Sequence, residues 1–339
     1  MTSTAPTTAT TESPAPRAPR RAALDPLLAS CLWGGMYVVS RASFGAIPPV
    51  TLAALRVVIG GLTLATALFL LRARRADSAG APVWRRADQL RALGCGAVVA
   101  ACILMQFLGT DLASAHDGAL LTTVTPIFIV PLAWALLGER PTKRIAGGML
   151  LALAGVVIVV VVQTAGTGSA AQPVSLLGDA LLLGSAFCWA LFTVLGAPLT
   201  RRFSALAAST AATLWSILFI VPLVPIELLS LRRGQHTPIS FTPLSVAAVL
   251  YLGWGATALA WLLWYRGVAR LAAGVAAVYF FAQPLVGGVL SGLLLHESLS
   301  PGFWLGGGVL AGGILLVSWA PRGHGAPPPA ARTTGNDAR

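Results

Sequence analysis

Long apolar segments follow one another along nearly the whole chain, and short polar breaks rich in proline, glycine and arginine separate them. Each run of about 20 uncharged residues is long enough to cross a hydrocarbon layer of ~30 Å as a helix. The runs are continuous, unlike the alternating strands of a membrane β-barrel. The pattern predicts an all-α integral membrane protein with ten transmembrane helices. We expect these helices at about residues 24–44, 50–71, 90–112, 117–137, 143–163, 175–196, 205–226, 243–265, 271–295 and 302–320.

One stretch of the chain occurs twice, over residues 118–158 and 276–316. Each copy is an apolar run that contains a proline, then a polar break that contains a glutamate, then a glycine-rich apolar run. In the first copy 13 positions separate Pro126 from Glu139, and the proline and glutamate of the second copy have the same spacing. A repeat that keeps only apolar character, a kink and a cap predicts two helices joined by a short turn.

The repeat divides the chain into two halves of five helices each. We expect a disordered cytoplasmic tail over residues 1–23, a first repeat over 24–163, a linker over 164–174, a second repeat over 175–320 and a second disordered tail over 321–339. An odd number of helices in each half turns the second half upside down in the membrane. Two inverted five-helix repeats of this kind give many secondary transporters two equivalent gates around a midplane site.

Composition and charge agree with a membrane protein. The chain is 56% hydrophobic and 10% charged, and its mean hydropathy is +0.79, whereas soluble domains contain about 25% charged residues. The net charge of +12 comes from basic residues in short loops, and 19 of the 23 fall in segments of one predicted side. Such loops are cytoplasmic, so we expect a multi-pass protein of the plasma or inner membrane with both termini in the cytoplasm, and no nucleic-acid partner.

The motifs of the chain resemble those of EamA-type transporters in the drug/metabolite transporter superfamily. The resemblance covers about residues 24–320. The matching residues are Trp33-Gly34-Gly35 with Arg41, Leu55-Arg56, Leu137-Gly138-Glu139-Arg140-Pro141-Thr142, Trp189 and Gln283-Pro284 followed by Glu297-Ser298-Leu299-Ser300. Two features depart from the family pattern: His296 stands where glycine is usual, and the second half has no arginine that matches Arg56. The resemblance implies ten helices, alternating access and movement of small metabolites or drugs, usually outward.

Polar and aromatic side chains inside the predicted helices are candidates for a substrate pathway. A charge such as that of Arg56 is costly in an apolar run unless it faces a cavity, a partner or, by snorkelling, the interface. Tryptophan and tyrosine either form interfacial belts or wall a pocket for an apolar or zwitterionic substrate. The pathway candidates are Trp33, Tyr37, Arg56, Gln106, Thr125, Trp189, Trp261, Tyr265, Tyr279 and Gln283.

The prolines and glutamates of the repeat have structural interpretations. Pro126 and Pro284 are expected to kink their helices near the midplane. The glutamates lie in the turns that follow, so turn formation and helix capping are favoured over substrate binding. The predicted turn and cap residues are Glu139, Thr142, Glu297 and Ser300.

These features together favour a secondary transporter that exports a small metabolite, an amino acid or a drug-like amphipathic compound. The alternative is a membrane-embedded sensor or assembly partner without transport. An enzyme is not expected, because the histidines are scattered and no nucleophile–base pair is present. The four cysteines lack Cys-x-x-Cys spacing, so we predict no metal site, and no cofactor is expected. The expected partners are the lipid bilayer and a small-molecule substrate, and pairs of glycines four apart leave a homodimer possible.

Overall fold

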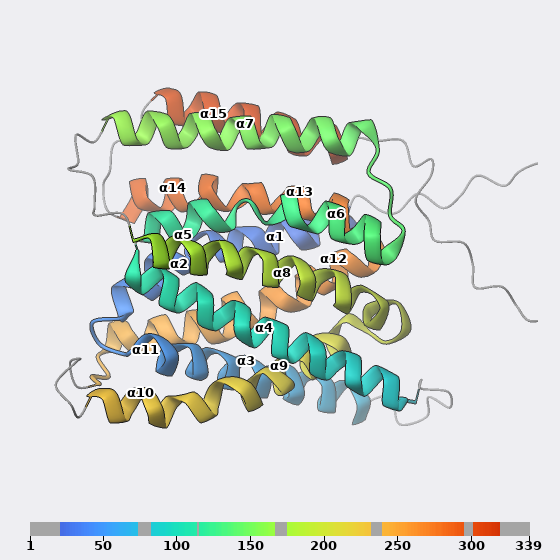
Figure 1. Ribbon diagram of the computed structural model, residues 1–339, viewed down its shortest axis with the longest axis vertical. Helices are drawn as coiled ribbons and strands as arrows, with labels where there is room; N and C mark the ends of the chain where they lie inside the picture. The colour runs from blue at the N-terminus through green and yellow to red at the C-terminus, as the bar shows by residue number, and fades with distance from the viewer. Residues whose placement is uncertain are drawn as a thin grey trace, which may run out of the picture.

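The computed structural model describes residues 21–73, 83–113, 115–166, 175–231, 239–294 and 301–318, and all regular secondary structure in these ranges is helical (Figure 1). The first half contains α1 (Arg21–Gly34), α2 (Met36–Ser43), α3 (Pro49–Ala73), α4 (Arg86–Leu112), α5 (Ala115–Thr122), α6 (Thr125–Leu137) and α7 (Lys143–Gly166). The second contains α8 (Leu176–Arg202), α9 (Ala205–Ile220), η1 (Val221–Leu223), α10 (Val224–Leu231), α11 (Pro243–Leu250), η2 (Tyr251–Leu259), α12 (Ala260–Arg270), α13 (Ala273–Val278), η3 (Tyr279–Phe281), α14 (Ala282–Leu294) and α15 (Pro301–Ser318).

The all-helical membrane architecture predicted from the sequence is confirmed. Within the described ranges, six helical runs are long and apolar enough to cross a membrane, and shorter apolar helices accompany them over Thr125–Leu137, Ala273–Gly287 and Pro301–Val317. The outer surface of the bundle is itself apolar, since Phe69, Leu176 and Leu305 each expose more than half of their surface. Such a surface suits lipid chains, because a soluble monomer rarely leaves so much apolar area in contact with water.

Local sequence signals set several helix ends. The Thr242 side chain accepts a hydrogen bond from the Ser245 backbone N–H, the Ser245 side chain accepts one from the Thr242 backbone N–H, and Pro243 occupies the first turn of α11. Ser204 caps α9 in the same way, by accepting from Ala207 N at 3.1 Å. These contacts satisfy backbone donors that have no partner within the helix.

The sequence pattern predicts kinked but continuous helices over residues 117–137 and 271–295. In the structure both are broken. The first breaks between α5 and α6, and Pro126 lies in the opening turn of α6. The second passes through the short 3₁₀ segment η3 before α14, and Pro284 lies in the opening turn of α14. Proline cannot donate to the carbonyl one turn earlier and its ring crowds that carbonyl, which is why the helix restarts here and does not simply bend.

Helices α7 and α15 form a separate layer along one side of the bundle (Figure 1). They cross antiparallel with their backbones in contact: Gly148 lies against Gly313, and Gly155 lies against Gly306. A Cβ atom on Gly155 would come within 2.6 Å of Gly306 O. Gly306 and Gly313 occupy the repeat positions of Gly148 and Gly155. If the two helices are exchanged, the Gly148–Gly313 contact becomes the Gly306–Gly155 contact, so the crossing has an approximate two-fold symmetry.

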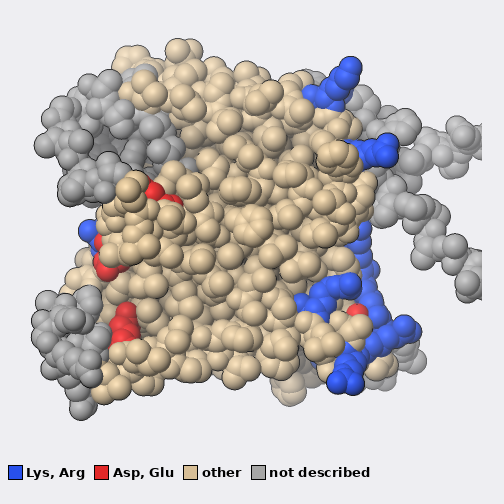
Figure 2. All heavy atoms as spheres, in the orientation of Figure 1, with Lys and Arg blue, Asp and Glu red and all other residues tan. Residues whose placement is uncertain are grey.

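Charged side chains gather at the two ends of the bundle. Lys and Arg collect at the end where α4 begins and α12 finishes, and most of the visible Asp and Glu lie at the opposite end (Figure 2). The band between the ends is almost free of charge on the visible face. We call these two regions the basic end and the acidic end.

The close crossing of α7 and α15 predicts an asymmetric response to alanine at two glycines of α7. Gly155→Ala forces the two backbones apart, and we expect it to destabilise the protein by about 1–3 kcal/mol because the contact is already tightly packed. Gly147 has open space around it, so Gly147→Ala serves as the matched control and should be neutral or slightly stabilising. Thermal unfolding of both purified variants tests this, and equal melting temperatures would contradict the packing described.

Candidate functional site

An internal cavity lies where the midpoints of several helices meet. Eight of the ten residues named as pathway candidates line it. They are Trp33, Tyr37, Arg56, Gln106, Thr125, Trp189, Trp261 and Gln283. The space open to the centres of water molecules is about 30 Å³, and one water needs about 10–15 Å³ by this measure. The cavity in this conformation therefore holds a few waters and no larger molecule.

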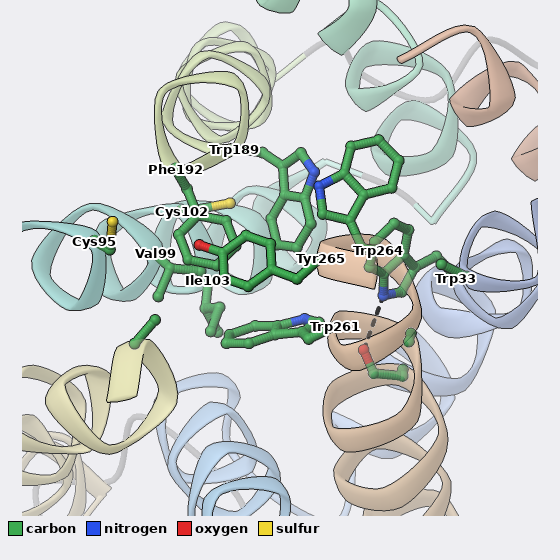
Figure 3. Close-up of a cluster of buried hydrophobic side chains, with 14 of the residues drawn as sticks. Trp33, Cys95, Val99, Cys102, Ile103, Trp189, Phe192, Trp261, Trp264 and Tyr265 are labelled. Atoms are coloured by element: carbon green, nitrogen blue, oxygen red, sulfur yellow. Dashed lines mark hydrogen bonds between the residues drawn. The ribbon is translucent and has the colours of Figure 1, made fainter. Parts of the chain in front are cut away.

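Aromatic rings form the side of the cavity that faces the basic end. The rings of Trp33 and Trp189 meet edge to face with centroids 5.0 Å apart, and Trp33 also lies 5.4 Å from Phe280. Trp261 approaches Trp189 at 5.8 Å, and Figure 3 shows these indoles grouped between their helices. Edge-to-face and tilted contacts at these separations are the favoured geometries of aromatic pairs.

Hydrogen bonds close the side of the cavity that faces the acidic end. The Tyr37 hydroxyl donates to Thr122 Oγ1 at 2.6 Å and accepts from Gln106 Nε2 at 2.7 Å. These contacts join α2, α4 and α5. Gly118 permits this arrangement, because a Cβ atom there would meet the Tyr37 ring at 2.6 Å.

Arg56 lies in the wall of the cavity and is only 2% exposed. Its Nε donates to Thr257 Oγ1 at 2.9 Å, and Nη1 lies 3.2 Å from the sulfur of Met36. Nη1 also reaches Gln106 Oε1 at 3.5 Å, and Nη2 reaches Ala256 O at 3.4 Å. All four partners are neutral. The guanidinium is thus buried among dipoles and contacts no carboxylate among the described residues.

Two features of the sequence bring Arg56 to this position. Gly60 and Gly253 let α3 and η2 approach closely: a Cβ on Gly60 would lie 2.6 Å from Thr257 Cγ2, and one on Gly253 would lie 2.6 Å from Ile59 Cγ2. The segment η2 is a π-helix, a form that often marks functional sites. Its Ala256 carbonyl also accepts a hydrogen bond from Trp33 Nε1 at 2.8 Å (Figure 3).

Three buried donors of the lining have no hydrogen-bond acceptor within the described ranges. They are Trp189 Nε1, Trp261 Nε1 and Gln283 Nε2. Thr125, the repeat mate of Gln283, differs, because its hydroxyl donates to Thr122 O, the carbonyl that Pro126 leaves without a partner. The two repeats therefore place different chemistry at equivalent positions.

Two of the sequence candidates lie outside the lining. Tyr265 stacks on Phe192 with centroids 5.1 Å apart, and it lies against Gly196, on the far side of the aromatic group from the cavity. Tyr279 is buried in η3 but is not part of the lining. The lining also contains residues that the sequence reasoning missed. They are Met36, Cys102, Ile103, Thr122, Ser185, Ala186 and Phe280.

Ion pairs hold the helices together at the basic end. Arg201 contacts Glu139 at 2.7 Å, Arg202 contacts Asp88 at 2.8 Å, and Arg270 contacts Asp25 at 3.1 Å. Each pair joins two different spans. The set links helices of both halves at this end through polar contacts.

The turn residues act partly as the sequence predicts. Gly138, with φ of 71°, ends α6, and Thr142 Oγ1 accepts a hydrogen bond from Ile145 N at 3.3 Å in the first turn of α7. Glu139 caps a helix of the other half: its Oε2 accepts from Ala273 N at 2.8 Å, at the start of α13. Glu297 and Ser300 lie outside the described residues.

A different set of contacts closes the acidic end. Glu227 of α10 accepts hydrogen bonds from Val50 N at 2.8 Å and from Thr51 N at 2.7 Å, and so caps the start of α3. Arg41 pairs with Asp111 at 3.2 Å. The contacts at the acidic end share no residue with the ion pairs at the basic end.

Two long parts of the chain match the same protein family. The model of the EamA-like transporter family matches residues 22–161 and again residues 176–319. The chain belongs to the EamA-like transporter family. This EamA-like transporter is a multi-pass membrane protein, and its family indicates transport rather than enzymatic catalysis.

Relatives of this EamA-like transporter carry transporter names without a substrate. It is 31% identical over 210 residues to the uncharacterized transporter YetK of Bacillus subtilis, and the alignment covers 62% of this chain and 61% of YetK. It is 25% identical over 293 residues to an uncharacterized transporter of Archaeoglobus fulgidus, with 86% and 95% of the two chains covered. A solved crystal structure superposes with a TM-score of 0.71 at 21% identity, over 88% of this chain and 98% of that one, which shows a common fold.

The hydrogen bonds of Tyr37 predict a specific stability loss. Tyr37→Phe leaves the Gln106 amide buried with one acceptor fewer, and a buried unsatisfied donor costs about 1–3 kcal/mol. Tyr251→Phe is the matched control, because its hydroxyl donates to a backbone carbonyl, Leu32 O, and leaves no side-chain amide without a partner. We expect Tyr37→Phe to lower the melting temperature more than Tyr251→Phe does. The opposite order would contradict the hydrogen-bond network.

Proposed function

We propose that this protein is a secondary transporter that works by alternating access and exports a small metabolite, an amino acid or a drug-like amphipathic compound. The observation that carries the proposal is the central cavity lined by aromatic and polar side chains, between two ends that separate sets of contacts hold together. A carrier needs such an arrangement, because one closure must open while the other stays shut.

The size of the cavity identifies the state of this conformation. Space for a few waters is too small for a metabolite, and ligand cavities that bind drug-sized molecules are about 300–1,000 Å³. In the proposed cycle the cavity must therefore be wider when it takes up a solute than it is in this conformation. Opening either end separates aromatic or polar contacts at its own side and enlarges the cavity.

The two halves supply the two gates as inverted five-helix repeats. Support comes from the antiparallel α7–α15 contact, in which Gly148 and Gly155 exchange roles with Gly306 and Gly313. The short broken segments α5–α6 and α13–α14 also run in opposite directions (Figure 1). Ten transmembrane helices, with the repeats bounded near residues 24–163 and 175–320, complete this arrangement.

The basic end is the cytoplasmic end in our proposal. Short cytoplasmic loops of membrane proteins are rich in Lys and Arg, and Figure 2 shows these side chains concentrated at one end. Both termini then lie in the cytoplasm of a cell with this protein in its plasma or inner membrane. The Glu139–Arg201 pair belongs to the inner gate, and the Glu227 cap and the Arg41–Asp111 pair belong to the outer gate.

Solute counterflow into proteoliposomes tests the proposal. Panels of amino acids, organic acids, amines and sugars are presented to the reconstituted wild type, and we expect saturable flux for at least one class. Trp189→Ala should lower that flux at least about tenfold, because it removes an aromatic wall of the cavity. Trp304→Ala is the matched control, since Trp304 is 59% exposed on α15, and its flux should equal that of the wild type.

Absence of flux for every class would favour the alternative, a membrane-embedded sensor or assembly partner without transport. Equal flux in the Trp189 and Trp304 variants would show that solute passes by another route.

A further inference from the structure

The cavity carries one positive charge and no compensating negative charge. Arg56 is buried and keeps its charge in any protein environment. None of the other lining residues is acidic. An unpaired cation in the membrane interior is costly, and such residues normally pair or mark a ligand pathway.

The unpaired hydrogen-bonding groups of the cavity are also suited to an anion, because they are donors. Trp189 Nε1, Trp261 Nε1 and Gln283 Nε2 are donors without acceptors. The hydroxyls of the lining already donate to helix carbonyls: Thr122 to Gly118 O and Ser185 to Leu182 O. The lining therefore contains three donors that an acceptor on a solute could satisfy.

We propose that the substrate is an organic anion, with a carboxylate that binds at Arg56 and an apolar body that packs on the tryptophan wall. This inference rests on the proposed transport function. A carboxylate supplies a negative charge for Arg56 and acceptor lone pairs for the three unpaired donors. A guanidinium binds a carboxylate through paired N–H donors. In this conformation the Nη1 and Nη2 groups of Arg56 contact Met36, Gln106 and Ala256 at 3.2–3.5 Å. These contacts are long, so a carboxylate could replace them with stronger hydrogen bonds.

A purely structural role for Arg56 makes a different prediction. In that role Arg56 only joins α3 to η2 through Thr257 and Ala256, and the charge of the solute has no effect on binding. The three unpaired donors would then have no common purpose. The anion hypothesis accounts for the arginine and the donors together.

Ligand-induced thermal stabilisation of the purified full-length protein distinguishes the two roles. The probes are butyrate, 3-phenylpropanoate and phenylalanine, each compared with its amide, which keeps the shape and removes the negative charge. Stabilisation grows with ligand occupancy. We expect at least one acid to raise the melting temperature, with its amide binding at least about tenfold more weakly.

Variants assign the preference to Arg56. Arg56→Gln should weaken binding of the acid about 10- to 100-fold, because it removes a charge-assisted contact, and should change amide binding less. Arg56→Lys keeps the charge and should still bind the acid more tightly than the amide. This variant tests the role of the charge if Arg56→Gln fails to fold. Arg72→Gln, at the exposed end of the same helix, is the matched control and should bind as the wild type does.

Equal binding of acid and amide, stronger binding of the amide, or no stabilisation by any of the three acids overturns the anion hypothesis. These outcomes test the anion hypothesis and not the proposed transport function, which the counterflow assay tests. A protein that carries amines or amides in the counterflow assay remains a transporter but lacks the anion preference. A protein that binds acids at Arg56 but carries no solute keeps the site and loses the transport function.

Discussion

The membrane interior offers no water to an unpaired backbone group, and this constraint governs the whole structure. Every span must be a helix except where another group of the protein satisfies the backbone. Three irregular segments lie near the centre of the bundle. The break before Pro126, the π-helix η2 and the 3₁₀ segment η3 all border or supply the central cavity. Thr125 satisfies the carbonyl of Thr122 at the first of these segments.

The same irregular segments supply the chemistry of the cavity. The π-helix turns Ala256 O toward the side chains of Trp33 and Arg56. The restart of α14 brings Gln283 to the cavity with its amide nitrogen unpaired. Both contacts therefore lie at or beside segments that depart from α-helical geometry. Stability and function thus draw on the same few residues, and the glycines at the crossing of α3 and η2 make the arrangement sterically possible.

The sequence alone predicted the helical class, because long hydrophobic runs carry that signal directly, and eight of the ten residues that it named as pathway candidates line the cavity. Helical spacing could have found more of the lining: Met36, Thr122 and Phe280 each stand three positions from a residue that was identified. Tyr265 was named as a pathway candidate because tryptophan and tyrosine can wall a pocket, but Trp261 lines the cavity whereas the Tyr265 ring stacks on Phe192 of α8. That choice depends on a neighbouring helix and leaves no local pattern.

Other features depend on contacts between the halves and were beyond single-sequence reasoning. Glu139 was expected to act within its own turn, yet it caps α13 and pairs with Arg201. The π-helix also has no simple periodic signature, since the apolar pattern around Gly253 and Gly255 fits an ordinary helix.

Access to Cys102 from the two sides of the membrane tests the central claim most directly. Cys102 lines the cavity and is 2% exposed, and Cys31, Cys95 and Cys188 can be replaced by alanine to leave it as the single thiol. A membrane-impermeant thiol reagent is applied to right-side-out and inside-out vesicles in the presence of a transported solute. Alternating access predicts that Cys102 is labelled from both sides, and labelling from one side only would contradict it.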